Sequence, residues 1–239
     1  MAGGAYIALS GLRARVDQLD RLASDLANAG TSGYKAERTT TVAAERPTFR
    51  AALESAVDVA SGPGRIDFRP GTIEPTGRDL DFALEGDAFF VVDTPQGARY
   101  TRNGQFSRRA DGTLTTSDDM PIAGEDGTIK LSQGAVTVDA DGTVRAGGVA
   151  AGKLRLARFQ DLNVLTREDN GRFRAPAEAA LAPTAVTVKA GSLEQSNVSV
   201  ADRMVQLTEL SRGFEALQRG ITILMNDVDG KAISELGRR

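Results

Sequence analysis

A regular row of apolar residues runs through the last part of the chain. Val200, Leu207 and Phe214 are spaced by seven residues, and further apolar residues follow at the same spacing. A seven-residue repeat corresponds to 3.5 residues per turn, which is the period of a coiled-coil seam. The pattern therefore predicts a long helix over residues 197–228 whose seam packs against another helix. The predicted seam residues are Leu207, Leu210, Phe214, Leu217, Ile221 and Leu224.

The start of this helix carries its own signal. Ser199 and Asp202 have the spacing of a capping box, so we expect the helix to begin there. Arg203 interrupts the apolar seam in its first heptad, with Met204 beside it. The periodicity does not explain why the charged Arg203 stands at this position.

A second seam occupies the first part of the chain. Its apolar residues alternate in steps of three and four, which is again a 3.5 period. They are Leu9, Leu12, Val16, Leu19, Ala23 and Leu26. Asn28 and Gly30 then favour the end of a helix that covers residues 1 to about 28. Ordinary amphipathic helices that pack on a central domain also contain short heptad runs, so periodicity leaves both arrangements open.

Between the two seams the pattern changes. Residues 36–64 are polar and weakly patterned, and predict either a connecting arm or a surface loop. Within them, Phe49, Leu53 and Val57 have the spacing of one short helix. From residue 65 onward, alternating apolar and polar residues predict strands.

Several strands and turns follow from local signals. Residues 80–85 alternate as in a half-buried strand, and residues 88–92 form an apolar run typical of a strand buried on both faces. After a turn at 95–97, a strand is expected at 99–101. Asn103-Gly104 and Asn170-Gly171 predict hairpin turns. Two further strands are expected at residues 153–159 and 185–188.

An internal repeat lies in the middle of this region. Asp111-Gly112-Thr113, Asp126-Gly127-Thr128 and Asp141-Gly142-Thr143 recur every fifteen residues. Asp-Gly is favoured in type I′ turns, so the repeat predicts a run of hairpins. Residues 139–142 also resemble the start of a calcium-binding loop, but the later ligands of such a loop are missing, which favours turns.

Together these patterns predict a mainly β protein with α: N- and C-terminal helices form a coiled-coil-like layer around a central antiparallel all-β domain. The expected divisions are a first helix with its turn over 1–35 and a connecting arm over 36–64. An antiparallel β domain over 65–190 and a C-terminal helix over 191–239 follow.

Composition excludes several classes of function. The 239 residues contain no Cys and no His, which removes thiol and disulfide chemistry and the commonest general base and metal ligand. The net charge is −3, without a basic run, which argues against nucleic-acid binding. The N-terminus has no signal-peptide pattern, and no stretch is apolar over the length of a membrane span.

One acidic cluster deserves a test as a catalytic site. Asp79, Asp81, Glu85 and Asp87 are close in sequence, but they alternate with apolar residues. This alternation predicts that they lie on the solvated face of a strand. We therefore expect no enzyme activity, and no catalytic, cofactor-binding or metal-binding residues.

Four motifs resemble those of bacterial flagellar rod and hook proteins. Residues 26–35 resemble the signature LAN-x-x-T-x-G-[YF]-K, and residues 191–198 resemble the C-terminal signature G-x-LE-x-SNV. Residues 212–215 resemble the R-x-[FY]-E that follows it. Residues 80–92 and 100–106 are similar to the β-domain signature of the FlgF/FlgG rod subfamily.

Two positions depart from the family pattern. Ser24-Asp25 stands where Asn-Asn is common, and Asp119-Met120-Pro121 replaces the usual turn after the second β-domain motif. The resemblance nevertheless covers nearly the whole chain in the expected order. Within the family, the compact length and the C-terminal tail are most similar to proximal-rod members.

The resemblance implies a structural subunit of the flagellar basal-body rod that polymerises into the helical drive shaft. Its implied partners are other rod subunits, further copies of itself and the flagellar type III export apparatus. It implies export without signal-peptide cleavage and a rod that spans the periplasm, with the seam residues and Asn28 at subunit interfaces. The alternatives are a distal-rod subunit or, from another class, a secreted glycan- or calcium-binding β module.

Overall fold

The chain forms two compact units in a computed structural model. The structure describes residues 2–38, 64–181 and 186–236, while side chains of residues 2–12, 223–236 and a few positions between them lie outside the described set. Unit 1 comprises Met1–Ala27, Glu37–Arg65 and Ser199–Arg239, and unit 2 comprises Asn28–Ala36 and Ile66–Val198. The division into four segments expected from the sequence stays a prediction.

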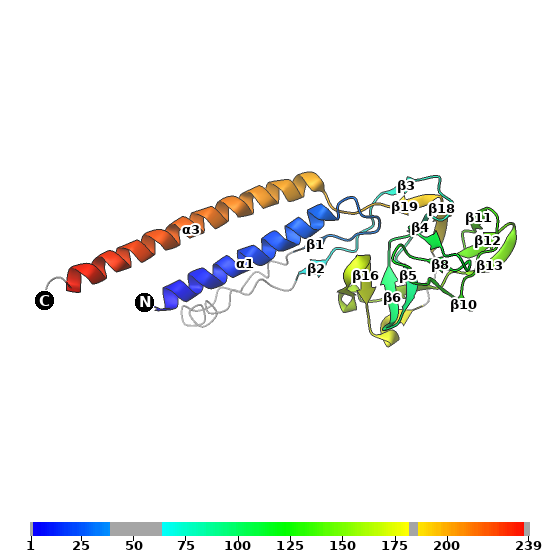
Figure 1. Cartoon of the computed structure of the whole chain (residues 1–239), viewed down its shortest axis with the longest axis horizontal. Coiled ribbons are helices and arrows are strands. Elements are labelled where there is room, and N and C mark those ends of the chain that lie inside the picture. Colours follow the sequence, from blue (N-terminus) through cyan, green and yellow to red (C-terminus); the bar gives the residue numbers. More distant parts are fainter. Residues whose placement is uncertain (1, 39–63, 182–185, 237–239) are drawn as a thin grey trace. The chain divides into compact units, whose positions relative to one another are not determined.

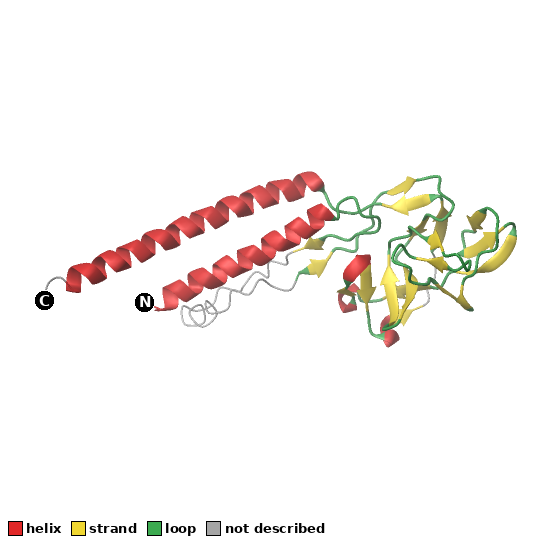
Figure 2. Cartoon of the chain, viewed as in Figure 1, coloured by secondary structure: helices red, strands yellow, loops and turns green. Residues whose placement is uncertain are grey.

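Unit 1 is built on two helices, α1 (Ala2–Ala27) and α3 (Val200–Leu236), which lie side by side in Figures 1 and 2. The backbone N–H of Asp202 donates to the Ser199 hydroxyl at 3.4 Å, so α3 begins where the sequence predicted. The predicted end near Val228 was wrong, since the helix continues to Leu236. A single glycine such as Gly230 costs a helix only about 1 kcal/mol, which is too little to end it.

Two short strands accompany these helices. β1 (Glu37–Arg38) pairs with β2 (Arg65–Ile66) in a two-stranded sheet. The connecting arm predicted for residues 36–64 falls mostly on residues 39–63. These residues, including the short helix expected around Phe49, Leu53 and Val57, lie outside the described part of the chain.

Unit 2 is an antiparallel β structure, which confirms the mainly β fold class. Its largest sheet has six strands in the order β15-β16-β6-β5-β14-β17. They are β15 (Thr166–Arg167), β16 (Arg172–Arg174), β6 (Gly97–Thr101), β5 (Phe89–Thr94), β14 (Leu156–Phe159) and β17 (Ala180–Leu181). The 3-10 helices of this unit are η1 (Leu162–Val164), η2 (Asp169–Gly171) and η3 (Ala177–Ala179).

Smaller sheets surround this one. β3 (Ile73–Pro75) pairs with β19 (Ser192–Glu194), and β4 (Phe82–Glu85) pairs with β18 (Thr187–Ala190). The others are β7 (Ser107–Arg108) with β8 (Leu114–Thr115), β9 (Ala123–Gly124) with β10 (Gly127–Thr128), and the three-stranded β11 (Val136–Val138), β12 (Thr143–Ala146) and β13 (Val149–Lys153).

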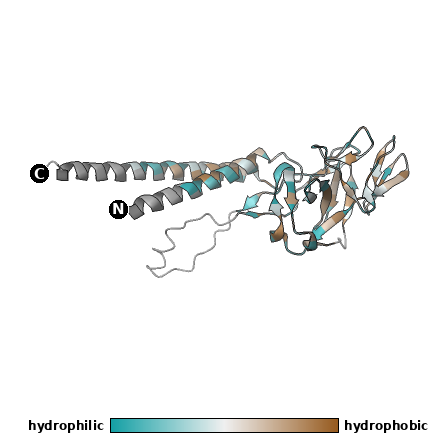
Figure 3. Cartoon of the chain, turned by 60° about the horizontal axis from the view of Figure 1, so that its bottom comes forward, coloured by the Kyte–Doolittle hydropathy of each residue, from teal (hydrophilic) through white to brown (hydrophobic). Residues whose placement is uncertain are grey.

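Strand β5 is the centre of the unit and is buried on both faces, as its apolar run predicted. Phe90 and Val92 contribute to one hydrophobic core, and Phe89 and Val91 contribute to a second core across the sheet. Figure 3 shows hydrophobic ribbon along the strands of this unit. The turn at Pro95-Gln96 joins β5 to β6 in a hairpin, so that prediction is also confirmed.

Edge-to-face contacts between aromatic rings fill both cores. On one side, the ring of Phe106 packs against Phe82 and Phe90 at centroid distances of 5.6 and 5.0 Å. On the other, Phe89 packs against Phe159 and Phe173 at 5.7 and 5.9 Å. The sequence contains no Trp, so phenylalanine supplies the large rings of these cores.

The Asp-Gly repeat forms hairpins, as predicted, but none of its three turns is of type I′, because Asp111, Asp126 and Asp141 lack the positive φ that this turn requires. In the first repeat, the Gly112 N–H donates to the Arg109 carbonyl at 2.9 Å, and Gly112 adopts a positive φ of 87°. The third repeat is the same, with Gly142 bonded to Asp139 at 2.9 Å and a φ of 88°. Each is a turn followed by a left-handed glycine bulge and not a type I′ turn.

The two Asn-Gly pairs have different outcomes. Asn170 and Gly171 both have positive φ, at 60° and 67°, and join β15 to β16 in the predicted hairpin. The hairpin predicted at Asn103-Gly104 was wrong. There the chain runs close to another strand: the Phe82 N–H donates to the Gly104 carbonyl at 3.0 Å. A Cβ atom on Gly104 would meet the Phe82 carbonyl oxygen at 1.7 Å, so close backbone packing explains this glycine.

The C-terminal part of unit 2 also differs from the prediction. The strand expected over 153–159 is interrupted at Leu154-Arg155, where Leu154 bridges to Gly124 in the neighbouring hairpin. Strand β18 is close to the expected one at 185–188, although residues 182–185 are outside the described set. Strand β19 was missed, because three residues are too few for a periodic pattern to show.

Candidate functional site: the helix seams and a buried ion cluster

The described part of the α3 seam is partly buried. Leu207, Leu210 and Phe214 are half-buried, and so is Arg203 one heptad step before Leu210. In contrast, Val200, which the periodicity placed on the seam, is 42% exposed. The side chains of Leu217, Ile221 and Leu224 lie outside the described residues, so their role in the seam stays a prediction.

On α1 the buried face is centred between the predicted seam residues. Leu19 and Leu26 are half-buried, but Val16 is 40% exposed. Among the described side chains of α1, the most buried are Leu22 and Asp25, at 8% and 1% exposure. The side chains of Leu9 and Leu12 lie outside the described residues. Asn28 is half-buried and closes the turn after α1, where the Thr31 N–H donates to its carbonyl at 3.0 Å.

An ion pair explains why a charged residue interrupts the α3 seam. The Arg203 guanidinium lies 3.0 Å from the carboxylate of Asp25, and the same nitrogen donates to the Glu37 carbonyl at 3.2 Å. The Glu37 N–H donates to both oxygens of the Asp25 carboxylate at 3.2 and 3.3 Å. The family departure at Asp25 therefore supplies the negative charge that holds Arg203 within unit 1.

A second and more deeply buried ion cluster lies in unit 2. The Lys35 ammonium is 2.5 Å from one carboxylate oxygen of Glu194, and the Arg102 guanidinium is 3.2 Å from the other. Lys35, Arg102 and Glu194 are 0%, 4% and 1% exposed. Each comes from a different motif of the family signature, so the motifs that are distant in sequence meet at one carboxylate.

Backbone groups complete the cluster. The Lys35 ammonium also donates to the Arg69 carbonyl at 2.9 Å, and the Gly71 N–H donates to Glu194 at 3.0 Å. The Arg102 guanidinium donates to the carbonyls of Leu84 and Gly86 at 3.3 and 2.5 Å. Buried charges are tolerated when most of their hydrogen-bonding capacity is used in this way, although the Nε atom of Arg102 is buried without a hydrogen-bond partner among the described residues.

The electrostatics of the two cations follow from their burial. Desolvation lowers the pKa of Lys35, and the nearby Glu194 carboxylate counteracts this by favouring the charged form. Desolvation likewise lowers the pKa of Arg102, again opposed by Glu194. The positive charge of Arg102 lowers the pKa of Lys35 further. Glu194 is thus the common counter-ion of two cations that repel each other.

Beside this cluster, residues 33–36 form hydrogen bonds with residues 194–197. These are the C-terminal ends of the two chain segments that make up unit 2. The Gly33 N–H donates to the Glu194 carbonyl at 2.7 Å, and the Ala36 N–H donates to the side-chain oxygen of Asn197 at 2.7 Å. The Asn197 amide in turn donates to the carbonyl of Asp67 at 2.7 Å. The segment 33–36 is therefore an integral part of unit 2.

The acidic cluster is not on one solvated face, so that part of the prediction was wrong. Asp81 is 3% exposed, and its carboxylate accepts a hydrogen bond from the Thr76 hydroxyl at 2.8 Å. Asp79 and Asp87 are exposed, and Glu85 forms an ion pair of 2.6 Å with Lys189. Asp81 also lies 3.4 Å from the Arg78 guanidinium, and a strand pattern reveals neither this partner nor Thr76.

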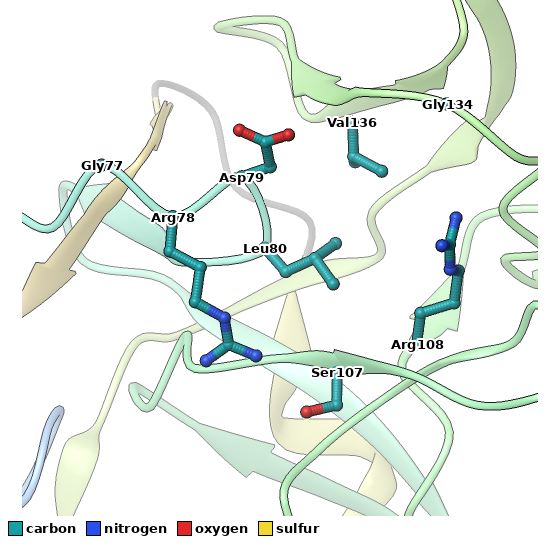
Figure 4. Close-up of a pocket in the computed structure, with 8 residues that line it drawn as sticks. All are labelled: Gly77, Arg78, Asp79, Leu80, Ser107, Arg108, Gly134 and Val136. Atoms are coloured by element: carbon teal, nitrogen blue, oxygen red, sulfur yellow. The ribbon is translucent and has the colours of Figure 1, made fainter.

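A cleft of about 640 Å³ lies next to this loop (Figure 4). Its lining side chains include Arg78, Asp79, Leu80 and Arg108. The Arg78 guanidinium donates to the Phe106 carbonyl at 2.8 Å, and Arg108 donates to the Ser132 carbonyl at 3.1 Å. Both cations of the cleft are therefore engaged by the protein's own backbone.

The calcium-loop alternative is not favoured by the geometry. Asp139 forms an ion pair of 2.7 Å with Arg145, and Asp141 accepts hydrogen bonds from the backbone and hydroxyl of Thr143. Within the described ranges, no group of three acidic residues is arranged to hold a metal ion. None of the described helices contains an apolar stretch of the length and hydropathy needed to cross a bilayer.

Two parts of the chain match known protein families. Residues 83–146 match the family described as Flagellar hook protein FlgE/F/G D1 domain, and these residues include Arg102. Residues 189–229 match the family described as Flagellar basal body rod FlgEFG protein C-terminal, and these include Glu194, Asn197 and Phe214. Both matches thus contain members of the buried cluster.

Curated relatives cover nearly the whole chain. It is 34% identical to Flagellar basal-body rod protein FlgF of Rhizobium meliloti (strain 1021), with 99% of each chain covered. It is 34% identical to the protein of the same name from Salmonella typhimurium (strain LT2), with 95% of each chain covered. It is 30% identical to Flagellar basal-body rod protein FlgG of Bacillus subtilis (strain 168), with 91% of this chain and 93% of the relative covered.

Proposed function

The chain belongs to the flagellar basal-body rod proteins of the FlgF/FlgG type, and from this membership we propose how its two units serve a rod. It is a structural subunit of the rod in the flagellar basal body, where it assembles with other rod or hook components, and it is not an enzyme. The FlgF type is favoured over the FlgG type, with identities of 34% against 30%.

In the assembled rod, the terminal helices form a coiled-coil-like layer by packing against helices of neighbouring subunits, and unit 2 remains outside this contact. The observation that supports this best is the large apolar surface that the helices expose in a single chain. Val16, Val200, Met204 and Val205 are 40%, 42%, 53% and 59% exposed. Apolar surface of this kind is stabilised when a partner covers it.

The half-buried seam residues take part in the same layer. Leu207, Leu210 and Phe214 retain exposed area when α1 and α3 of one chain pack together, so a neighbouring helix can complete their burial. The remaining interface residues of the proposal are Leu9, Leu12, Val16, Leu19, Leu26, Asn28, Leu217, Ile221 and Leu224. Coiled-coil seams are formed by such knobs, each inserted among four residues of the facing helix.

The route to the rod is a further part of the proposal. The chain leaves the cytoplasm through the flagellar type III export apparatus without cleavage of a signal peptide, and polymerises across the periplasm at the proximal end of the rod. Support comes from the family membership.

The test is deletion of the gene in its own host, with complementation by the intact gene. We expect the deletion to stop rod, hook and filament formation, so that basal bodies isolated from the mutant end before the rod. A deletion strain that swims and builds complete hooks would contradict the proposal. Restoration of swimming by the intact gene is the control for effects on neighbouring genes.

A further inference from the structure

The ion cluster of unit 2 joins segments that are far apart in the chain. Lys35 and Glu194 are 159 residues apart, and Arg102 and Glu194 are 92 residues apart. Glu194 is the last residue of β19, the final strand of the unit. The only carboxylate bonded to both buried cations in the described structure is therefore supplied by the C-terminal segment.

Without that segment, unit 2 would bring Lys35 and Arg102 together without the carboxylate that both are bonded to. The carboxylates of Asp67 and Asp87 would each still favour the charged form of one of them. Lys35 and Arg102 are fully or almost fully buried, and both are bonded to the same carboxylate. A buried charge that loses its partner is strongly unfavourable, and here two like charges would share one site. Folding of the unit around the two cations is then unfavourable until Glu194 docks beside them.

Other contacts of the C-terminal segment also dock it against the rest of unit 2. Strand β19 pairs with β3, and β18 pairs with β4. Asn197 bonds to Ala36 and to the carbonyls of Asp67 and Arg69. These contacts place Glu194 at the cluster, and the carboxylate then neutralises it.

We propose that Glu194 is a charge lock: unit 2 closes only when the segment 192–197 docks and neutralises Lys35 and Arg102. A chain that lacks this segment, or has not yet presented it, holds the two cations apart and leaves the β unit open. The consequence for export rests on the function proposed above. In such a rod subunit, the β unit would stay open during export until its C-terminal segment docks.

The test uses full-length protein and chemical unfolding followed by circular dichroism in the near ultraviolet. Glu194→Gln keeps the size of the side chain, removes its charge and replaces one acceptor oxygen by an amide donor. We expect the equilibrium constant for folding of unit 2 to fall by roughly 100-fold or more, as for other broken buried ion pairs. The matched control is Glu85→Gln, which breaks the exposed pair with Lys189 in the same unit and should change the constant by about twofold.

A second variant separates charge from shape. Lys35→Met added to Glu194→Gln removes one of the two repelling cations, so the double variant should fold at least about tenfold better than Glu194→Gln alone. A steric role for Glu194 predicts the opposite, because the double variant then carries two defects in one site. A double variant that is less stable than Glu194→Gln would overturn the charge lock.

Refolding kinetics test the order of events. If closure waits for Glu194, the loss caused by Glu194→Gln appears mainly as slower folding. If it appears only as faster unfolding, the cluster forms after the unit has closed, and the lock is overturned. These measurements concern the free chain, so their failure leaves the rod function untouched, and a failed gene-deletion test leaves the lock untouched.

Discussion

Unit 2 and unit 1 of this chain bury their apolar residues to very different extents. In unit 2, the rings of Phe82, Phe90 and Phe106 are completely buried in a core that the unit closes by itself. In unit 1, Val200, Met204 and Val205 remain exposed on α3, which packs against α1. Unit 2 thus closes its core within one chain, and the exposed apolar residues of unit 1 support the proposal that neighbouring subunits complete its burial.

The ion pairs of the two units also differ in how deeply they are buried. Unit 2 surrounds Lys35 and Glu194 completely, while the Arg203–Asp25 pair of unit 1 leaves its arginine side chain 15% exposed. Removing one residue of a pair should therefore have a larger effect on the free chain in unit 2 than in unit 1. Substitutions and proteolysis can test this contrast between a unit closed within one chain and a unit proposed to depend on partners.

The largest expected effect is on assembly and comes from a substitution in unit 1. Phe214→Ala removes the largest described side chain of the α3 seam, and every subunit of a helical polymer would repeat the defect. We expect rod assembly to be lost, while the melting temperature and the β-sheet circular dichroism of the monomer stay almost unchanged. Electron microscopy of isolated basal bodies checks the first expectation, and thermal melts check the second.

The matched control is Glu209→Ala, at an exposed position of the same helix outside the family motifs and the seam, which should leave assembly intact. The contrast between the units would be broken if Phe214→Ala lowered the melting temperature of the monomer by several degrees. That result would place the helix in the stable core of a single chain.

A smaller effect, on stability alone, is expected from the core of unit 2. Leu154 is 1% exposed, and Leu154→Ala should reduce the free energy of unfolding of unit 2 by about 2–5 kcal/mol through lost burial and the cavity left behind. Urea unfolding of the monomer measures this change.

Val149→Ala serves as its control, because Val149 is 70% exposed and its truncation should change the free energy of unfolding by less than about 0.5 kcal/mol. Equal effects of Leu154→Ala and Val149→Ala would show that the core around Leu154 is not formed in the free protein.

The smallest expected effect is a shift of a few residues in the C-terminal boundary of a protease-resistant fragment. Limited proteolysis of the monomer should trim both terminal helices and leave the β unit. The periodicity alone places the end of this fragment near residue 190, but the contacts of Glu194 and Asn197 extend it to about residue 198.

Mass spectrometry of the fragments reads this boundary directly. A fragment that ends before Glu194 and stays folded would show that the C-terminal segment is dispensable for unit 2. A chain that resists trimming of its helices would show that unit 1 is stable without partners.

Local sequence patterns were sufficient for the features that depend on near neighbours. The capping residue Ser199, the doubly buried run at 88–92 and the Asn170-Gly171 hairpin all appear where the sequence predicts them. Turn chemistry and periodicity act over a few residues, so one sequence can reveal them. The family motifs added the function, which neither composition nor periodicity indicates.

Only the tertiary structure shows which residues of those motifs contact one another. The sequence shows Lys35, Arg102 and Glu194 only as charged residues within three motifs, and nothing in their spacing indicates that they share one buried site. The same holds for Asp25, which is a departure in the sequence and the partner of Arg203 in the structure. Ion pairs between residues more than ninety positions apart depend on how the whole chain folds, and a periodic pattern carries no information at that distance.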